Sequence, residues 1–345
     1  FDDLPLAWGV TVLALGAVAA FFGVVFALSQ HDLKRLLAYH SIENIGIILL
    51  GLGLAMAGRS LGRPDWVVLG MAGCLLHVWN HALFKSLLFF GAGSVVHATG
   101  SRDLERLGGL ARRMPATAML FGAGALAICG LPPWNGFVSE LVIYLGLVRA
   151  AVAPGAELAS AAGSGAWVAL AAPVLAATGA LAVACFVKVV GIVFLGTPRS
   201  AAAGEAHESP RAMLGPMAVL AVLCALLGVA PGMVAPALER AAAVWAGAPL
   251  AGSVPGVYAL VSPLNIAVFS RTRRLGFFRF TQLLLILILF PPLFGEGYES
   301  IKTISQLNAA ELTTTSILST VLQHEYSLLL FLGALMFLKV VAAAI

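Results

Sequence analysis

Three titratable residues repeat every four positions inside a long apolar stretch. His77, His81 and Lys85 lie within residues 66–96, and a helix would place them on one face, about one turn apart. A lysine at mid-membrane depth costs about 3 kcal/mol and is a functional candidate by default. Because an imidazole titrates near pH ~6.5, the two histidines could exchange protons with such a lysine. The alternative is a structural lysine that extends from a helix end to the membrane surface.

A second pair of titratable residues lies in the preceding apolar run. His40 and Glu43 share a helical face at i, i+3 spacing within residues 36–57. An unpaired carboxylate at membrane depth would simply take up a proton. The alternative for this pair is a polar cap near the membrane surface. Lys188, in the middle of residues 166–195, is a further candidate, with a structural role as its alternative.

A third site is indicated where a helix must break. Pro132, Pro133 and Gly136 interrupt the apolar residues 117–147. In hydrocarbon, the freed backbone groups need protein or a water-filled cavity to satisfy them. Glu140 follows this break, and a broken helix with a carboxylate beside it is a common form of ion site in membranes. The alternative is that Glu140 caps the first turn of the second helix.

These residues stand out because the rest of the chain is poor in charge. Of its 345 residues, 60% are hydrophobic and 10% charged, and the mean hydropathy is +0.98. Soluble domains carry about 25% charged residues, so the composition excludes a soluble enzyme, a nucleic-acid-binding protein and a disordered chain. We expect an all-α polytopic transmembrane helical bundle with at least one broken helix. At ~20 residues per span, it would have about 8–11 spans.

Apolar runs delimit the predicted spans. The runs are residues 5–28, 36–57, 66–96, 117–130, 137–147, 166–195, 213–230, 235–248, 275–293 and 327–345. The run 66–96 is too long for one upright helix, so it is tilted, kinked or really two helices. If it crosses once, six basic loop residues share one side and only Arg59 and Arg63 lie on the other, which predicts that the first side is cytoplasmic. The six are Lys34, Arg35, Arg102, Arg106, Arg112 and Arg113. If the run crosses twice, this orientation fails.

No pattern in the sequence indicates a catalytic centre or a cofactor. The four cysteines, Cys74, Cys129, Cys185 and Cys224, stand singly in apolar stretches. Zinc and iron–sulfur sites need paired cysteines, so this spacing excludes them. A Ser-His-Asp set, a phosphate-binding loop and a dinucleotide-binding motif are also absent from the sequence. We therefore expect no metal, no redox cofactor and no nucleic-acid partner.

Four motifs in order resemble one family. Residues 31–41, HDLKRLLAYHS, resemble the DxKRxLAYS segment of antiporter-like membrane subunits. Such subunits occur in respiratory NADH–quinone oxidoreductase, Mrp-type cation antiporters and membrane-bound energy-converting hydrogenases. The resemblance continues through residues 80–94, 103–110 and 131–140. The version HSIENIG most resembles the hydrogenase-4/formate hydrogenlyase component B branch, which has an extra acidic pair at the positions of His40 and Glu43.

The resemblance implies a proton-translocating fold of two inverted repeats, each with a broken helix and a key titratable residue. Lys85 is then the central channel lysine, with His81 beside it, and Glu140 is the residue of the broken helix. Lys188 matches an FVK segment of a following helix. Together with the relay partner His77, these residues make up the predicted proton pathway: Lys85, His81, His77, Glu43, His40, Glu140 and Lys188.

The composition changes near Ser253. Residues 1–253 contain 52 Ala and 7 Ile, whereas residues 254–345 contain 8 Ala and 7 Ile. We interpret 1–253 as the C-terminal half of an antiporter-like domain, without the N-terminal repeat and its glutamate–lysine pair. Residues 254–345 would be a distinct membrane module, a fusion or part of another subunit. The last of them, 316–345, faintly resemble another complex I membrane-arm subunit, subunit 6 or J.

The predicted function is conduction of protons or Na⁺ through an energy-transducing inner membrane. It would be coupled to electron transfer in a partner hydrogenase or an NADH–quinone oxidoreductase-like complex. The partners would be other membrane-arm subunits, a peripheral redox module and the lipid. The alternative is a structural or assembly subunit that retains the fold without transport.

Overall fold

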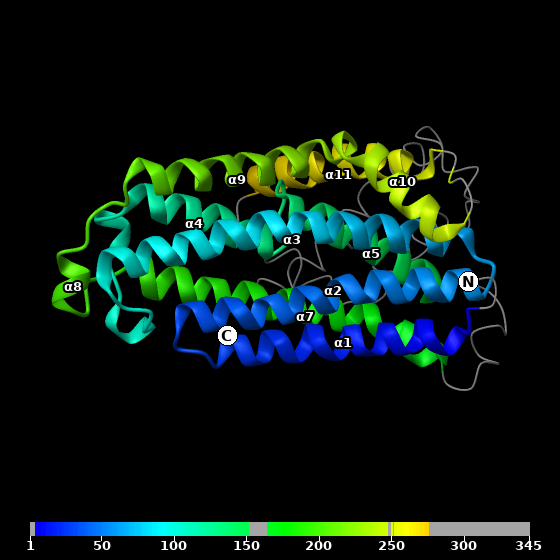
Figure 1. Ribbon diagram of the computed structural model, residues 1–345, viewed down its shortest axis with the longest axis horizontal. Helices are drawn as coiled ribbons and strands as arrows, with labels where there is room; N and C mark the ends of the chain where they lie inside the picture. Colours follow the sequence, from blue (N-terminus) through cyan, green and yellow to red (C-terminus); the bar gives the residue numbers. More distant parts are fainter. Residues whose placement is uncertain (1–3, 152–163, 248–249, 251, 276–345) are drawn as a thin grey trace.

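Helices make up nearly all of the regular structure in the computed structural model, which describes residues 4–151, 164–247, 250 and 252–275. Three predicted segments lie wholly or mostly outside the described residues: the span 327–345, nearly all of the span 275–293, and most of the module 254–345. The long helices lie side by side along one axis (Figure 1). In chain order, the helices are α1 (Leu6–Leu28), α2 (Leu33–Ser60), α3 (Pro64–Thr99), α4 (Pro115–Ile128), α5 (Asn135–Ala151), α7 (Ser164–Phe194), α8 (Ala201–Gly204), α9 (Arg211–Val229), α10 (Ala235–Ala246) and α11 (Ser253–Leu275), with single 3₁₀ turns η1 (Leu104–Arg106), η2 (Leu110–Arg112) and η3 (Pro231–Met233).

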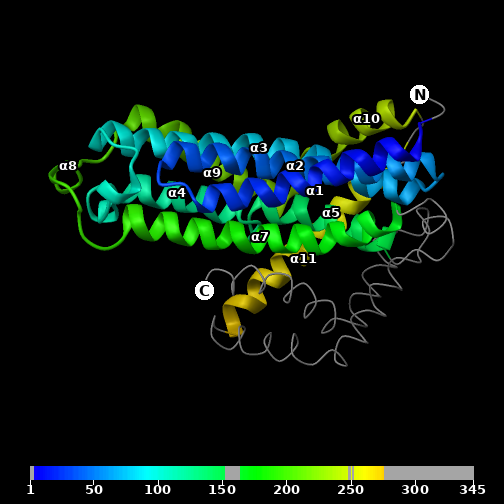
Figure 2. The same cartoon turned by 90° about the horizontal axis from the view of Figure 1, so that it is seen from below.

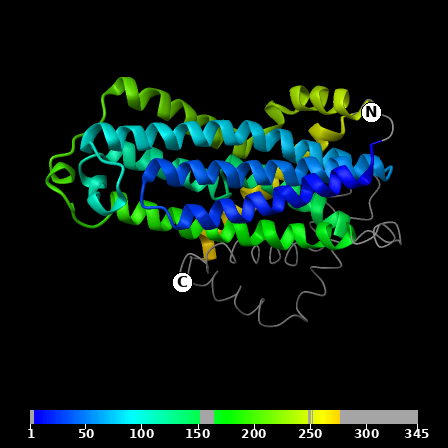
Figure 3. The same ribbon diagram turned by 60° about the horizontal axis from the view of Figure 1, so that its bottom comes forward.

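Within the part of the chain that the structure describes, five helices are long and apolar enough to cross a membrane. They are α1, α2, α3, residues Ala171–Phe194 of α7, and α9. The predicted fold class, a polytopic helical membrane protein, is thereby confirmed. The predicted span 235–248 needs correction, because α10 has 12 residues. At 1.5 Å per residue it is about 18 Å long, well short of a ~30 Å hydrocarbon core. Figure 3 shows α10 lying outside the long helices.

The run 66–96 is one helix. α3 is continuous over 36 residues, which corresponds to about 54 Å and exceeds the thickness of the hydrocarbon core. The loops before α2 and after α3 therefore lie at the same end of the bundle. There the N–H of Leu33 donates to Arg102 O (2.9 Å), and the N–H of Gly109 donates to Leu195 O (2.8 Å). The condition for the predicted orientation, a single crossing, is met.

Glycines set the close approach of α1 and α2. Gly46 of α2 faces α1, where an added Cβ would lie only 2.3 Å from Ala20 N. Gly23 of α1 faces α2 in the same way, and its added Cβ would lie 2.5 Å from Glu43 N. Small residues let membrane helices approach backbone to backbone. The backbone of α1 therefore covers one side of Glu43.

The predicted helix break is present, and α3 runs beside both halves. α4 ends at Ile128 and α5 begins at Asn135, so the two short helices follow one another along α3 (Figure 1). Gly130 has φ +56°, a conformation that glycine adopts without the cost that a side chain would bring. The N–H of Leu131 donates to Leu126 O (3.2 Å) and that of Trp134 to Leu131 O (3.0 Å). Such bonds partly satisfy the backbone that the break exposes.

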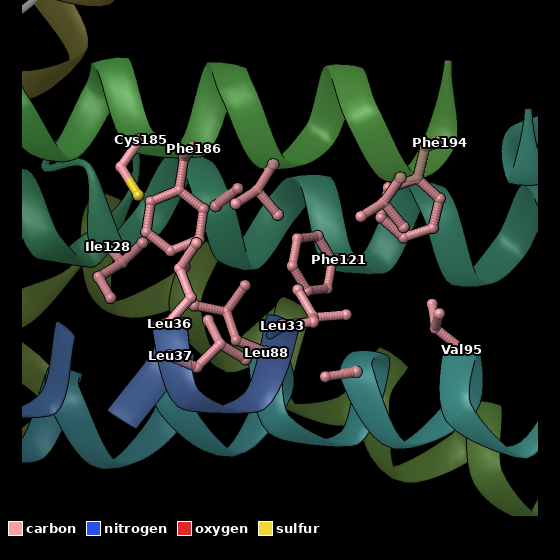
Figure 4. Close-up of a cluster of buried hydrophobic side chains, with 14 of the residues drawn as sticks. Leu33, Leu36, Leu37, Leu88, Val95, Phe121, Ile128, Cys185, Phe186 and Phe194 are labelled. Atoms are coloured by element: carbon pink, nitrogen blue, oxygen red, sulfur yellow. The ribbon is translucent and has the colours of Figure 1, made fainter. Parts of the chain in front are cut away.

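A large apolar cluster fills the bundle near the end that carries the loops before α2 and after α3, which we call the loop end. Figure 4 shows Phe121 of α4 and Phe186 and Phe194 of α7 facing the leucines of α2 and α3. The rings of Phe121 and Phe194 lie 5.2 Å apart between centroids. This cluster also contains Phe84 and neighbours of Lys85, so it separates the lysine from lipid and bulk water on that side.

α11 belongs to the same packed unit as the helices before it. The Tyr258 hydroxyl donates to Ala72 O of α3 (2.7 Å). Val254, Val257 and Val261 lie in one buried cluster with residues of α3 and α5. Figure 2 shows α11 crossing the bundle obliquely, starting from the region of α10.

Glu208 ties the loop before α9 to the start of α4. Its Oε2 accepts hydrogen bonds from the N–H groups of Ala116 (2.7 Å) and Thr117 (3.3 Å), and Oε1 accepts from the Thr117 hydroxyl (2.6 Å) and Ser209 N–H (3.0 Å). Partial burial raises the pKa of Glu208, but these hydrogen bonds outweigh it and hold the pKa below the ordinary 4.5. The carboxylate thus caps orphan donors of the helix.

Glu208→Gln should be less stable than the unaltered chain at neutral pH, and this difference in stability should disappear in acid. Because the folded state favours the charged form, its contribution is present above pH 4.5 and is lost as the pH falls through the lower folded pKa. We expect a cost of about 1 kcal/mol at pH 7, typical of a lost helix cap. Thermal unfolding in detergent at a series of pH values measures it. Glu205→Gln, an exposed residue of the same loop, is the control, and an undiminished difference in acid would contradict the cap.

Candidate functional site

His40 and Glu43 form a buried pair on α2. His40 Nδ1 contacts Glu43 Oε2 directly, and the two residues are 0% and 1% exposed. The His40 ring lies against Phe186 of α7, with centroids 4.8 Å apart. His40 Nε2 is buried without a hydrogen-bond partner within the described part of the chain. The two residues, which the sequence places on one helical face at i, i+3 spacing, are therefore in contact, and both are buried inside the protein.

Lys85 of α3 reaches toward α2. It is 6% exposed, and its Nζ donates to the backbone carbonyl of Leu37. The Nζ also lies 5.0 Å from the centre of the Phe89 ring. Glu43, less than two turns along α2 from Leu37, acts electrostatically on the lysine. The α2 carboxylate and the α3 amine are thus close enough for the charge of one to influence the other.

His77 connects α2 to α5. Its Nε2 lies 3.1 Å from Asn44 Oδ1, and its Nδ1 lies 2.9 Å from the Ser139 hydroxyl. The Asn44 amide nitrogen donates to His40 O (2.8 Å), which leaves its oxygen for His77. An amide oxygen only accepts, so the proton on Nε2 is required in every charge state of the ring. Whether His77 is neutral or charged therefore depends on whether Nδ1 carries a proton.

The Ser139 hydroxyl can serve either state of Nδ1. With neutral His77, it donates to Nδ1. With protonated His77, Nδ1–H donates to it, and the hydroxyl hydrogen can turn to Gly136 O, 3.2 Å away. Asn80 Nδ2 donates to Ser139 Oγ (3.0 Å) in either case. A single bond rotation thus gives Nδ1 of the fully buried imidazole a hydrogen-bond partner in both charge states.

Two asparagines hold the start of α5 against α3. Asn80 Nδ2 donates to Asn135 O (2.7 Å), and Asn135 Nδ2 donates to Asn80 Oδ1 (3.1 Å). Both side chains are fully buried. Asn135 is the first residue of α5, so this reciprocal pair positions Ser139 one turn later beside His77.

Glu140 lies at the break, as predicted. It is 3% exposed, and a Cβ added to Gly130 would lie 2.6 Å from its Oε1, so the carboxylate lies directly against the break. It also acts electrostatically on Tyr144, one turn further along α5. Glu140 follows Ser139 in the chain, so the break and the His77 link share one turn of α5.

Lys188 and His81 are less central than the other predicted residues. Lys188 Nζ donates to Leu28 O (2.8 Å), the last carbonyl of α1, and to Gln30 O (3.1 Å) in the loop that follows α1. These bonds fit the structural alternative. His81 is half-buried, and its Nε2 has no hydrogen-bond partner in the described residues. The charge of Lys85, one turn further along α3, acts electrostatically on its ring.

Asn44 and Ser139, the neutral residues that link His77 to α2 and α5, carry no charge that marks them in the sequence. Their only signal was their place inside the motifs 40–46 and 131–140. A buried ion pair that was not predicted from the sequence joins Asp65 of α3 to Arg149 of α5, with 2.7 Å between Oδ2 and Nε and both residues 6% exposed. Arg63 adds two contacts of 3.2 Å to the same carboxylate.

The described residues contain no group of three or more His, Cys, Asp and Glu side chains able to hold a metal ion. All four cysteines are buried thiols. A carboxylate, a lysine and imidazoles, which are groups that bind and release protons, are buried on α2 and α3, and His77 of α3 is hydrogen-bonded to both α2 and α5.

The chain is similar in sequence to membrane subunits of known complexes. Residues 5–162 match the family described as NADH:quinone oxidoreductase/Mrp antiporter, transmembrane. The chain is 44% identical over 254 residues to hydrogenase-4 component B of Escherichia coli (strain K12), covering 74% of this chain and 37% of that protein. It is 46% identical over 244 residues to formate hydrogenlyase subunit 3 of the same strain, covering 69% and 38%. The chain thus spans less than two fifths of these relatives.

Solved structures share the fold. A chain of the membrane-bound sulfane sulfur reductase, an archaeal respiratory membrane complex, superposes with a TM-score of 0.56 at 29% identity, covering 69% of this chain and 35% of that one. A chain of the Mrp complex from Dietzia sp. DQ12-45-1b gives a TM-score of 0.53 at 23% identity, covering 69% and 47%.

Proposed function

Because the chain belongs to the NADH:quinone oxidoreductase/Mrp antiporter family of membrane proteins, we propose that it conducts protons along the buried groups of α2, α3 and α5. The observation that carries the proposal is the link through His77. Asn44 fixes the proton on Nε2, and the rotating Ser139 hydroxyl serves Nδ1 both with and without a proton. A purely structural histidine needs only one such state.

The proposed path runs from the His40–Glu43 pair to Glu140. A proton bound at the pair changes the charge next to Lys85, which favours release of the proton held by the lysine. His81 passes protons between Lys85 and Nδ1 of His77, the ring nitrogen that gains and loses a proton, and the Ser139 hydroxyl connects that nitrogen to α5, where Glu140 lies at the break. Lys188, whose hydrogen bonds to Leu28 O and Gln30 O give it a structural role, is not a proton carrier in the proposed path.

The conducted ion is a proton rather than Na⁺. The central groups are an amine and imidazoles. They bind protons, but their charged forms repel a sodium ion and their neutral nitrogens are poor ligands for it. Sodium prefers oxygen ligands, and the nitrogen-rich middle of the path offers few of them. Two of the asparagine oxygens there are already occupied, because Asn44 Oδ1 accepts from His77 and Asn80 Oδ1 accepts from Asn135.

Conduction is driven by electron transfer in partner proteins. Relatives of the chain are named as components of hydrogenase-4 and formate hydrogenlyase. We place the chain in the membrane arm of such a complex, beside other membrane subunits and a peripheral redox module, in an energy-transducing inner membrane. The competing function is structural: the fold is kept for assembly and moves no protons.

His77→Leu distinguishes the two functions. Leucine fills the space but breaks the link between Asn44 and Ser139. In membrane vesicles that contain the intact complex, protons translocated per electron transferred should fall at least about tenfold, because a general acid–base group is lost. Electron transfer should continue. His97→Leu, exposed near the end of the same helix, is the control. An unchanged proton-to-electron ratio in His77→Leu would favour the structural function.

A further inference from the structure

α11 contributes one buried polar side chain to the helix break. Asn265 is fully buried, and its Nδ2 donates to Gly228 O (2.6 Å) and Pro133 O (3.1 Å). Pro133 belongs to the segment between α4 and α5, and Gly228 to the last turn of α9. One amide group thus joins three elements. It comes from the part of the chain whose composition differs from that of residues 1–253.

The carbonyls of Gly228 and Pro133 both lie outside the regular backbone hydrogen bonding of a helix. The carbonyls of the last turn of a helix have no partner within that helix, and the break lies outside α4 and α5. In apolar surroundings such groups need a partner from elsewhere in the protein. Gly228 brings the two carbonyls together, because a Cβ there would lie only 2.0 Å from Pro133 O. Asn265 then satisfies both with its two amide hydrogens.

The position of the break decides the position of Glu140. Gly130 in the break lies against the Glu140 carboxylate. Asn135, two residues after Pro133, carries the reciprocal bonds to Asn80. A shift of Pro133 away from α9 would therefore move both the carboxylate and the start of α5 that holds Ser139.

We propose that Asn265 is a positioning residue of the proton path, which holds the break between α4 and α5 against α9 and so places Glu140 and Ser139 against α3. The proposal rests on the proposed function for its effect on protons. The positioning itself is a statement about structure and is tested separately.

Native cysteines report on the break. Cys129 follows the last residue of α4, and Cys224 lies one turn before Gly228 on α9, whereas Cys74 and Cys185 lie on α3 and α7. All four thiols are buried. Alkylation of the intact complex in vesicles by N-ethylmaleimide, followed by mass spectrometry of each cysteine, measures how often each region opens.

Asn265→Ala and the similarly sized Asn265→Leu remove the donor. We expect alkylation of Cys129 and Cys224 to rise roughly fivefold, because local opening of the break becomes easier, while Cys74 and Cys185 stay as in the unaltered chain. Ser262→Ala is the matched control on α11, since among the described residues that hydroxyl donates to Tyr258 O of its own helix. No rise at Cys129 and Cys224, or an equal rise at all four cysteines, would overturn the local role.

The pH profile of proton translocation tests the link to the path. A displaced Glu140 and Ser139 should shift the profile in Asn265→Ala but not in Ser262→Ala. Local opening with an unshifted profile would overturn the functional half of the proposal. If His77→Leu leaves translocation intact, the proposed function fails, but the alkylation result still decides whether Asn265 holds the break.

Discussion

Lys85→Ala should abolish proton translocation in the intact complex while electron transfer continues. We expect a fall of at least about 100-fold in protons moved per electron, within the range for loss of a group that transfers protons. The lysine is buried, bound to Leu37 O and close to Glu43, so its loss removes the basic group that responds to the charge of the α2 pair. Proton uptake by membrane vesicles, measured with a pH-sensitive dye, gives the ratio.

Lys85→Arg separates charge from proton transfer. Arginine keeps the positive charge, but its guanidinium does not release a proton in proteins. If the amine passes protons, Lys85→Arg should fail nearly as completely as Lys85→Ala. Lys34→Ala, at the loop end of α2, should behave as the unaltered chain. Full activity in Lys85→Arg would contradict proton transfer by Lys85 and leave it only an electrostatic role.

Arg149→Leu should cost about 3–5 kcal/mol of folding stability, the second large effect that we expect. Removing the guanidinium leaves Asp65 buried beside an apolar side chain, and an unpaired buried carboxylate is costly. The pair joins the start of α3 to the end of α5. Arg63 remains within 3.2 Å of the carboxylate, which favours the lower end of the range. Unfolding in detergent followed by circular dichroism measures the change.

A double variant shows whether the cost comes from the unpaired charge. Replacing both Asp65 and Arg149 by leucine removes the buried charges together, and such apolar replacements are often neutral. We therefore expect the double variant to be more stable than Arg149→Leu alone. Arg63→Leu, whose side chain is 28% exposed, should cost about 1 kcal/mol or less. A stability of Arg149→Leu equal to that of the unaltered chain would show that the ion pair contributes nothing to holding α3 and α5 together.

Local features of the candidate site could be predicted from the sequence. The His40–Glu43 contact follows from i, i+3 spacing on a helix, and the break follows from two prolines and a glycine in an apolar run. Both depend on residues close in the chain. The length of α3 alone did not say whether residues 66–96 cross once, because a long apolar run is compatible with a tilted helix or with two.

Contacts between helices could not be predicted in this way. His77 meets Asn44 and Ser139, which lie 33 and 62 residues away, and Asn265 meets Pro133 from 132 residues away. Neutral asparagine and serine side chains carry no charge that marks them in an apolar sequence. Lys188 shows the opposite case: a charge in mid-run that the fold directs to the end of α1.

The amino-acid sequence by itself determined that this is a helical membrane protein, where its main helices run, where one of them breaks, and which few titratable residues lie in apolar surroundings. Those properties follow from composition and from the periodicity of a single helix. Only the tertiary structure decided which of these residues meet. The glycines of α1 and α2 and the contacts of the break with α3, α9 and α11 set which helix faces touch. A buried hydrogen bond depends on that contact, because its two groups must come within about 3 Å of each other.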